Sequence, residues 1–108
     1  MKRPRMEKFA QTPETYPSAE IKELYNAIVN ITSEKEASAF FRDLLTMAEI
    51  NEFASRWQMV KLLYQGYSYA QIAKKLNTST TTVTRVAYWL HHGMGGYKSV
   101  ADRLFTKK

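Results

Sequence analysis

The chain has 108 residues, no cysteine and a formal net charge of +6. Its length allows one domain of ordinary size, and 44% hydrophobic residues are enough for a core, which excludes wholesale disorder. The lack of cysteine excludes a disulfide framework and a zinc site with sulfur ligands. The sequence has neither a long apolar run nor a basic segment followed by an apolar stretch. We therefore expect a cytoplasmic protein without a membrane span or signal peptide.

The positive charge is concentrated in the second half of the chain. Residues 1–53 carry seven basic and nine acidic side chains, whereas residues 54–108 carry nine basic side chains and a single acid, Asp102. The net charges of these segments are −2 and +8. A positive field attracts polyanions, of which nucleic acid is the commonest in the cytoplasm, although acidic proteins and membrane surfaces also bind basic faces.

The first 17 residues differ from the rest in composition. They contain all three prolines and the basic residues Lys2, Arg3 and Arg5, and they show no apolar period. We predict a flexible basic arm over residues 1–17, which could contact phosphates at Lys2 to Arg5, followed by a helical domain over residues 18–108.

From Ser18 onward, apolar residues recur at helical spacing and no convincing period-two alternation is present, so the predicted fold is all-α. The predicted helices are residues 18–31, about 33–44, 46–66, 68–76, 79–92 and 99–105, with breaks at Gly66 and at Gly93, Gly95 and Gly96. Three pairs have the form of capping boxes: Ser33 with Glu36, Thr46 with Glu49, and Ser68 with Gln71.

The first three predicted helices each have an apolar face. The apolar stripe of the first helix contains Ile21, Leu24, Tyr25, Ile28 and Val29. In the second helix the residues expected to face inward are Ala37, Phe40, Phe41 and Leu44, and the third helix has a longer stripe of Ile50, Phe53, Ala54, Trp57, Val60 and Tyr64. Each face needs a partner to cover it.

Residues from about 68 to 92 have the spacing of a helix-turn-helix motif. Its helices cross steeply, so the first needs a small residue at the contact point, and Ala73 is there, after the apolar Ile72. Leu76 fills the core side of the turn, and Asn77 tolerates the positive φ that the turn requires. In the second helix, Val83 and Val86 are apolar and three residues apart, so we expect both to face inward.

The opposite face of the second helix is suited to the major groove of double-stranded DNA. It carries Ser79, Thr80, Thr81, Thr84 and Arg85, while Lys74 and Lys75 end the first helix and can lie over phosphates. Hydroxyl groups bond base edges or phosphates, threonine methyl groups contact thymine methyl groups, and an arginine bonds guanine or phosphate. An ordinary pair of helices with a solvent-exposed polar face and no DNA-binding role would have the same pattern. The motif also falls inside the segment of net charge +8, however, which favours DNA binding.

The chain resembles the tryptophan repressor family, in particular its relatives in Gram-positive bacteria. The resemblance rests on Leu45-Thr46, Arg56, Leu62-Leu63, Gly66, Leu76 and the run from Thr81 to Arg85, with one residue fewer just after Gly66. It covers about residues 44–105. It implies an intertwined homodimer whose N-terminal helices share one core, which fits apolar faces that a small monomer could hardly bury. It also implies two reading heads about 34 Å apart on a palindromic operator.

The resemblance further implies an effector site for tryptophan, formed by Thr46, Arg56 and Arg85. Where the family has a glycine and a serine near that site, this chain has Val86 and Trp89. One interpretation is that the Trp89 indole fills the pocket, which makes tryptophan a doubtful effector; the other is that Trp89 is an ordinary core or interface residue. Tyr69, Ala70 and Ala73 replace polar residues of the family, so the DNA target should differ.

Other function classes have weaker support. His91 and His92 are adjacent on a helix and cannot bind one ion from one face, no catalytic constellation is apparent, and no cofactor is predicted. We predict a sequence-specific DNA-binding transcriptional regulator, a repressor acting as a homodimer, with an effector left open. The alternative is a helical dimer that binds an acidic protein through its basic face and has no specific DNA target.

Overall fold

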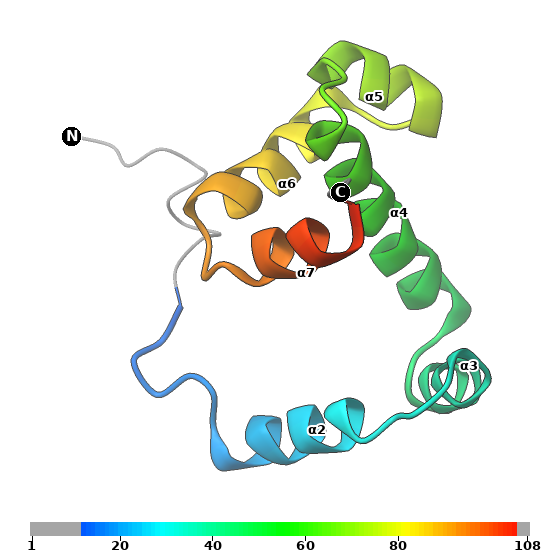
Figure 1. Cartoon of the computed structure of the whole chain (residues 1–108), viewed down its shortest axis with the longest axis vertical. Coiled ribbons are helices and arrows are strands. Elements are labelled where there is room, and N and C mark those ends of the chain that lie inside the picture. The colour runs from blue at the N-terminus through cyan, green and yellow to red at the C-terminus, as the bar shows by residue number, and fades with distance from the viewer. Residues whose placement is uncertain (1–11, 106–108) are drawn as a thin grey trace. The chain divides into compact units, whose positions relative to one another are not determined.

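The computed structural model describes residues 12–105, which form helices and connecting turns with no strand in that range. In chain order the described helices are α2 (Ala19–Val29), α3 (Glu34–Leu44), α4 (Met47–Tyr64), α5 (Tyr69–Leu76), α6 (Thr80–His92) and α7 (Gly96–Phe105) (Figure 1). The all-α prediction is confirmed. The contacts predicted for Lys2, Arg3 and Arg5 lie outside the described residues. None of the described helices is both long and apolar enough to cross a membrane.

Two of the three predicted capping boxes form as expected. At the start of α4, the Thr46 N–H donates to Glu49 Oε1 at 2.9 Å, and the Glu49 N–H donates to Thr46 Oγ1 at 3.1 Å. At the start of α5, the same reciprocal pair joins Ser68 and Gln71 at 2.8 and 3.1 Å. These bonds satisfy amide groups that have no partner within the helix, and so they fix where each helix begins.

The third predicted capping box is only half correct. The Glu36 N–H donates to Ser33 Oγ at 3.0 Å, as expected for a serine cap. The Glu36 carboxylate, however, accepts from the Thr32 N–H at 2.9 Å and the Thr32 hydroxyl at 3.3 Å, and not from the Ser33 amide. The carboxylate therefore bonds to the residue before the cap and not to the cap itself.

Helices α4 and α5 are each followed, within two residues, by a residue in the left-handed region. Gly66 after α4 has a φ of 94°, and Asn77 after α5 has a φ of 55°. Beyond Asn77 the Thr78 N–H donates to the Ala73 carbonyl at 2.9 Å, which is one of the two bonds of a Schellman motif. The predicted tolerance of Asn77 for positive φ is confirmed, and the turn between α5 and α6 depends on it.

The boundary between α6 and α7 departs from the prediction. A side chain at Gly93 would collide with the Trp89 carbonyl oxygen, so a glycine is needed where α6 ends. Helix α7 starts at Gly96, about one turn before the predicted Ser99, because the Gly95 carbonyl already accepts the Ser99 N–H at 2.9 Å. Gly96 is therefore a helical residue and not part of the break.

The described chain divides into two units, residues 12–51 and residues 52–105. The hydrophobic core belongs to the second unit, where α5 packs on α6 and α6 on α7. Its buried residues are Met59 and Val60 of α4, Ile72 and Ala73 of α5, Val83, Val86 and Leu90 of α6, and Ala101 of α7. Phe53 and Ala54, which belong to the predicted apolar stripe of the third helix, are both exposed, Phe53 by 49%.

The unit of residues 12–51 has no fully buried apolar side chain in α2 or α3. Most residues of the predicted apolar stripes of α2 and α3 are half-buried, and the others are exposed. Leu44, which was expected to face inward, is 47% exposed, and Val29 is 76% exposed. The amphipathic pattern is therefore present, but this unit does not bury it by itself.

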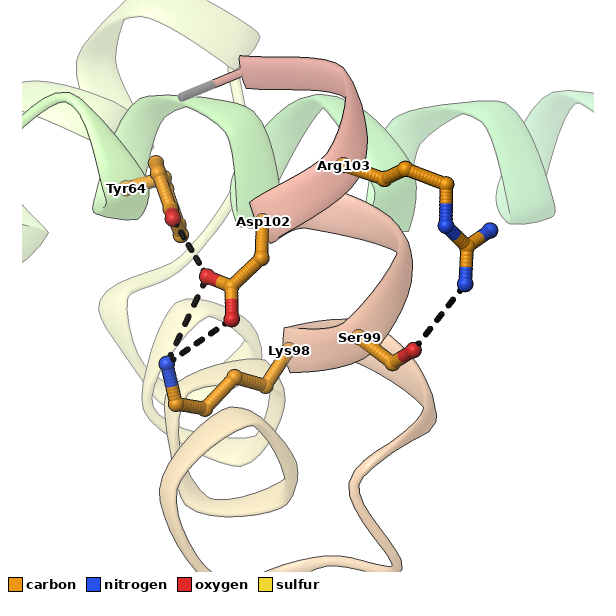
Figure 2. A network of polar contacts seen from close by, with 5 residues as sticks. All are labelled: Tyr64, Lys98, Ser99, Asp102 and Arg103. Atoms are coloured by element: carbon orange, nitrogen blue, oxygen red, sulfur yellow. Dashed lines mark hydrogen bonds and ion pairs between the residues drawn. The ribbon is translucent and has the colours of Figure 1, made fainter. Parts of the chain in front are cut away.

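Helix α7 is joined to α4 by a polar network around Asp102 (Figure 2). The Tyr64 hydroxyl donates to Asp102 Oδ1, and Lys98 Nζ lies 3.2 Å from Asp102 Oδ2. The Tyr64 hydrogen bond, followed by that of Lys98, lowers the pKa of Asp102 below its ordinary value of 3.8. The single acid of residues 54–108 thus helps to hold α7 in place.

This network predicts an acid-sensitive contribution to stability. Because the pKa of Asp102 is lower in the folded chain, the contribution is complete above about pH 5 and is lost as the pH falls through the folded-state pKa. We expect Asp102→Asn to lower the melting temperature near neutral pH and to have progressively less effect toward about pH 3. Thermal unfolding followed by circular dichroism at several pH values measures this.

Asp43→Asn is a matched control, since Asp43 is exposed and makes no hydrogen bond or ion pair with any residue of the described range. A loss of melting temperature for Asp102→Asn that is as large at about pH 3 as near neutral pH would contradict the role of the ionised carboxylate.

Candidate nucleic-acid interface

The packing of α5 against α6 agrees with the predicted helix-turn-helix. Ile72 is fully buried and Ala73 is 7% exposed, and both belong to the same cluster as Val83 and Val86 of α6. Leu76 is half-buried and packs against that cluster. The apolar side of the motif is thereby fixed, and the opposite side of α6 is left at the surface.

The predicted reading residues lie on this surface but differ in their local bonding. Thr80, Thr81 and Arg85 are exposed, and Thr84 is half-buried. Ser79 is exposed and caps α6: its Oγ accepts the Thr82 N–H at 3.2 Å and lies 3.1 Å from Thr82 Oγ1. The Ser79 hydroxyl is therefore engaged in the N-cap of α6, and its contact with DNA stays a prediction.

Thr84 is also bonded within the helix. Its hydroxyl donates to the Thr80 backbone carbonyl at 2.8 Å, four residues earlier. The Thr81 hydroxyl makes no hydrogen bond to any residue of the range 12–105. The threonines of α6 are therefore not equivalent in what they can offer to a ligand.

The two lysines at the end of α5 are exposed. Lys75 Nζ lies 5.2 Å from the centre of the Tyr67 ring, a distance at which a cation is attracted to an aromatic face. Tyr67 is partly buried and also packs against the core cluster. The ring limits the freedom of the Lys75 side chain while the ammonium group stays at the surface.

A cleft of about 400 Å³ lies against the inner side of α6. Its walls are Glu52, Ser55, Arg56 and Met59 of α4, Thr78 of the turn, Thr82, Arg85, Val86 and Trp89 of α6, and Tyr97 of α7. The cleft is within the size range of small-molecule sites. It brings together Arg56 and Arg85, two of the three residues predicted to hold an effector.

Arg56 already has a carboxylate partner in this cleft. Its guanidinium lies 2.5 Å from Glu52 Oε2, one helical turn earlier on α4, and both side chains are largely exposed. An external carboxylate that binds Arg56 would have to share or displace Glu52. The pair was missed in the sequence, although its (i, i+4) spacing is the usual one for ion pairs on a helix.

Trp89 lines the cleft and does not close it, since the space of about 400 Å³ remains beside it. Tyr97 is another wall that the sequence did not indicate, because α7 was expected to begin after it. Burial raises the pKa of the Tyr97 phenol, and the Arg56 guanidinium partly opposes that shift. A second cleft of about 390 Å³ shares Arg56 and Tyr97 with the first and is otherwise lined by Phe53 and Trp57.

The third predicted effector residue, Thr46, belongs to the unit of residues 12–51. There its hydroxyl oxygen caps α4, so its role toward an effector stays a prediction. Across residues 12–105, no three histidine or carboxylate side chains are placed to hold a metal ion. His91 and His92 are exposed neighbours at the end of α6.

Comparisons with known proteins agree with one another. The family model described as Trp repressor protein matches residues 19–105 of this chain. The uncharacterized protein YerC of Bacillus subtilis is 33% identical over 85 residues, which are 79% of this chain and 82% of that protein.

Two solved structures are similar to the whole fold. A TrpR-like protein from Eubacterium eligens superposes with a TM-score of 0.81 at 32% identity, covering 89% of this chain and all of that one. A candidate Trp repressor from Staphylococcus aureus superposes with a TM-score of 0.77 at 32% identity, covering 98% of this chain and 99% of that one.

The occupied Arg56 and the neighbouring indole predict weak binding of tryptophan. We expect isothermal titration calorimetry of the full chain with L-tryptophan to show no micromolar affinity, because Glu52 competes for Arg56 and Trp89 narrows the cleft. Arg56→Ala serves as the control. Micromolar binding by the natural chain that disappears in Arg56→Ala would contradict this prediction.

Proposed function

Because the chain belongs to the Trp repressor family, whose members are DNA-binding regulators and not enzymes, we propose that it binds a specific DNA sequence as a homodimer and represses transcription. The observation that carries the proposal is the outward face of α6, which is polar, exposed and lies in the segment of net charge +8. The family membership implies that it acts in the cytoplasm.

Affinity and selectivity for DNA are assigned to different residues. Lys74 and Lys75 are exposed cations at the C-terminal end of α5, where they would meet phosphates and add affinity that does not depend on sequence. The base-reading residues are Thr80, Thr81 and Thr84, with Ser79 and Arg85 at either side of them. These side chains sit on a helix held by a buried core, so they keep a fixed spacing.

The apolar residues of α2 and α3 support the homodimer. Neither helix has a buried side chain, and Val29 and Leu44 leave large apolar areas in contact with water. Covering such surface is favourable by roughly 25 cal/mol for each Å² removed from water. A second copy supplies the same surface in a symmetric interface and places a second recognition helix for the other half of a palindrome.

A second candidate is a helical dimer that binds an acidic protein through the basic residues 54–108. The net charge of +8 favours it as well, because charge alone does not distinguish an acidic protein from DNA. It does not use the short hydroxyl side chains of α6.

The DNA-binding proposal predicts a recoverable operator. Selection of bound duplexes from a randomised library, at about 0.15 M salt, should recover a palindrome with half-sites about one helical turn apart. Thr81→Ala should relax the preference at one position of each half-site, because a base contact is lost. Lys75→Ala should weaken all sequences alike and reduce the salt slope by about one unit for each head.

Equal weakening of every sequence by Thr81→Ala would contradict base reading by that residue. Recovery of no motif, with only weak and salt-sensitive binding, would favour the helical dimer that binds an acidic protein.

If the chain forms the proposed homodimer, a charge introduced on the apolar face of α2 should separate the protomers. Val29 is 76% exposed, so Val29→Glu should leave an isolated protomer folded but place a carboxylate in a dimer interface. We expect sedimentation velocity to report a dimer for the natural chain and a monomer for Val29→Glu. Asn26→Glu, with the same charge change on an exposed position of α2, should remain dimeric. A monomeric natural chain would contradict the proposal.

A further inference from the structure

The hydroxyl groups of Thr81 and Thr84 differ in whether their proton is available. The Thr84 hydroxyl donates to the Thr80 carbonyl at 2.8 Å, an ordinary hydrogen-bond length. The Thr81 side chain is exposed, and its hydroxyl makes no hydrogen bond within the described part of the chain. The two residues are three positions apart and so lie on the same side of α6.

A threonine hydroxyl has one proton to donate, together with lone pairs that accept. When that proton is held by a backbone carbonyl, a base acceptor gains little by competing for it, because one hydrogen bond is exchanged for another. The methyl group occupies a different staggered position on Cβ from the oxygen that faces the carbonyl. Thr84 is half-buried, so part of its side chain reaches the surface. Toward thymine, whose major-groove edge presents an acceptor and a methyl group but no donor, the methyl group of Thr84 is then the feature left to make a contact.

The major groove offers a partner for each of these groups. Guanine, adenine and thymine present acceptors to a hydroxyl proton, and thymine alone presents a methyl group. We propose that α6 divides base reading between the two residues: Thr81 reads through its hydroxyl, and Thr84 reads the 5-methyl group of a thymine through its own methyl. This inference rests on the proposed function, and it names the chemistry of the base that Thr84 recognises.

Two pairs of variants test the division. Valine keeps a methyl group and loses the hydroxyl, and serine keeps the hydroxyl and loses the methyl group. On the selected operator, Thr84→Val should bind within about two-fold of the natural chain, and Thr84→Ser should bind about four-fold more weakly for each half-site, the worth of one buried methyl group. Thr81 should show the opposite order, with Thr81→Val about ten-fold weaker for each half-site and Thr81→Ser nearly unchanged.

A second measurement uses the unaltered protein and so does not depend on how the variants fold. Replacing thymines of the operator one at a time by deoxyuridine removes the 5-methyl group and nothing else. One position in each half-site should weaken binding of the natural chain by about four-fold and leave binding of Thr84→Ser unchanged. Fluorescence anisotropy at about 0.15 M salt measures all of these affinities, with circular dichroism to compare the helix content of the four variants.

The outcomes separate this inference from the function on which it rests. Recovery of no operator would overturn the DNA-binding proposal itself. Recovery of an operator on which Thr84→Val is as weak as Thr84→Ser, or on which no thymine is sensitive to deoxyuridine, would overturn only the assignment of the methyl group. Equal affinity of both Thr84 variants and the natural chain would also overturn it, because Thr84 would then read nothing.

Discussion

The crossing of α5 and α6 is the contact on which the rest of the candidate interface depends. Ala73 is small enough for the two helices to approach, and Asn77, at a φ of 55°, lets the chain turn within a few residues of the end of α5. A β-branched residue at position 77 would be strained in that conformation. The direction of α6, and so of every side chain proposed to read DNA, follows from these two positions.

The two units differ in how completely they cover their apolar side chains. Residues 52–105 enclose a core that includes the fully buried Val60 and Ile72, whereas α2 and α3 have no buried residue. The same amphipathic spacing is present in both units. The units differ in whether another helix covers the apolar face. In the described chain, the apolar faces of α5 and α6 are buried in a core, and those of α2 and α3 are not. The simplest partner for the apolar faces of α2 and α3 is a second copy of the chain, because a symmetric dimer needs no other protein with a matching surface.

Most of the features that a local rule decides were predicted, except for the partner of Glu36 and the pair of Glu52 with Arg56, whereas features that depend on a distant neighbour were missed. The caps at Thr46 and Ser68 and the left-handed Asn77 depend on residues within one turn, and all were predicted. The exposure of Leu44 could not be predicted, because a helical stripe does not say whether a partner is present. Tyr97 was missed as a wall of the cleft because it reaches that place only through the packing of α7. Whether the residues of the cleft and of α6 bind anything stays a prediction.

The residue types on the outward face of α6 bear on how that face would select a DNA sequence. Both carboxylates of residues 52–105 lie beside a cation, Glu52 beside Arg56 and Asp102 beside Lys98, so each cancels the charge of that cation. The positive field of this unit therefore comes from its other basic side chains. That field attracts every DNA sequence equally and cannot select among them. Under the proposed function, selection would then fall to the side chains of α6. Because threonine is short, α6 must approach the base edges closely, and long side chains at positions such as Thr80 would hold the helix away. With short neutral residues at Thr80, Thr81 and Thr84 and the cations Lys74, Lys75 and Arg85 on either side of them, charge would bring the helix to the groove and the threonines would add the dependence on sequence.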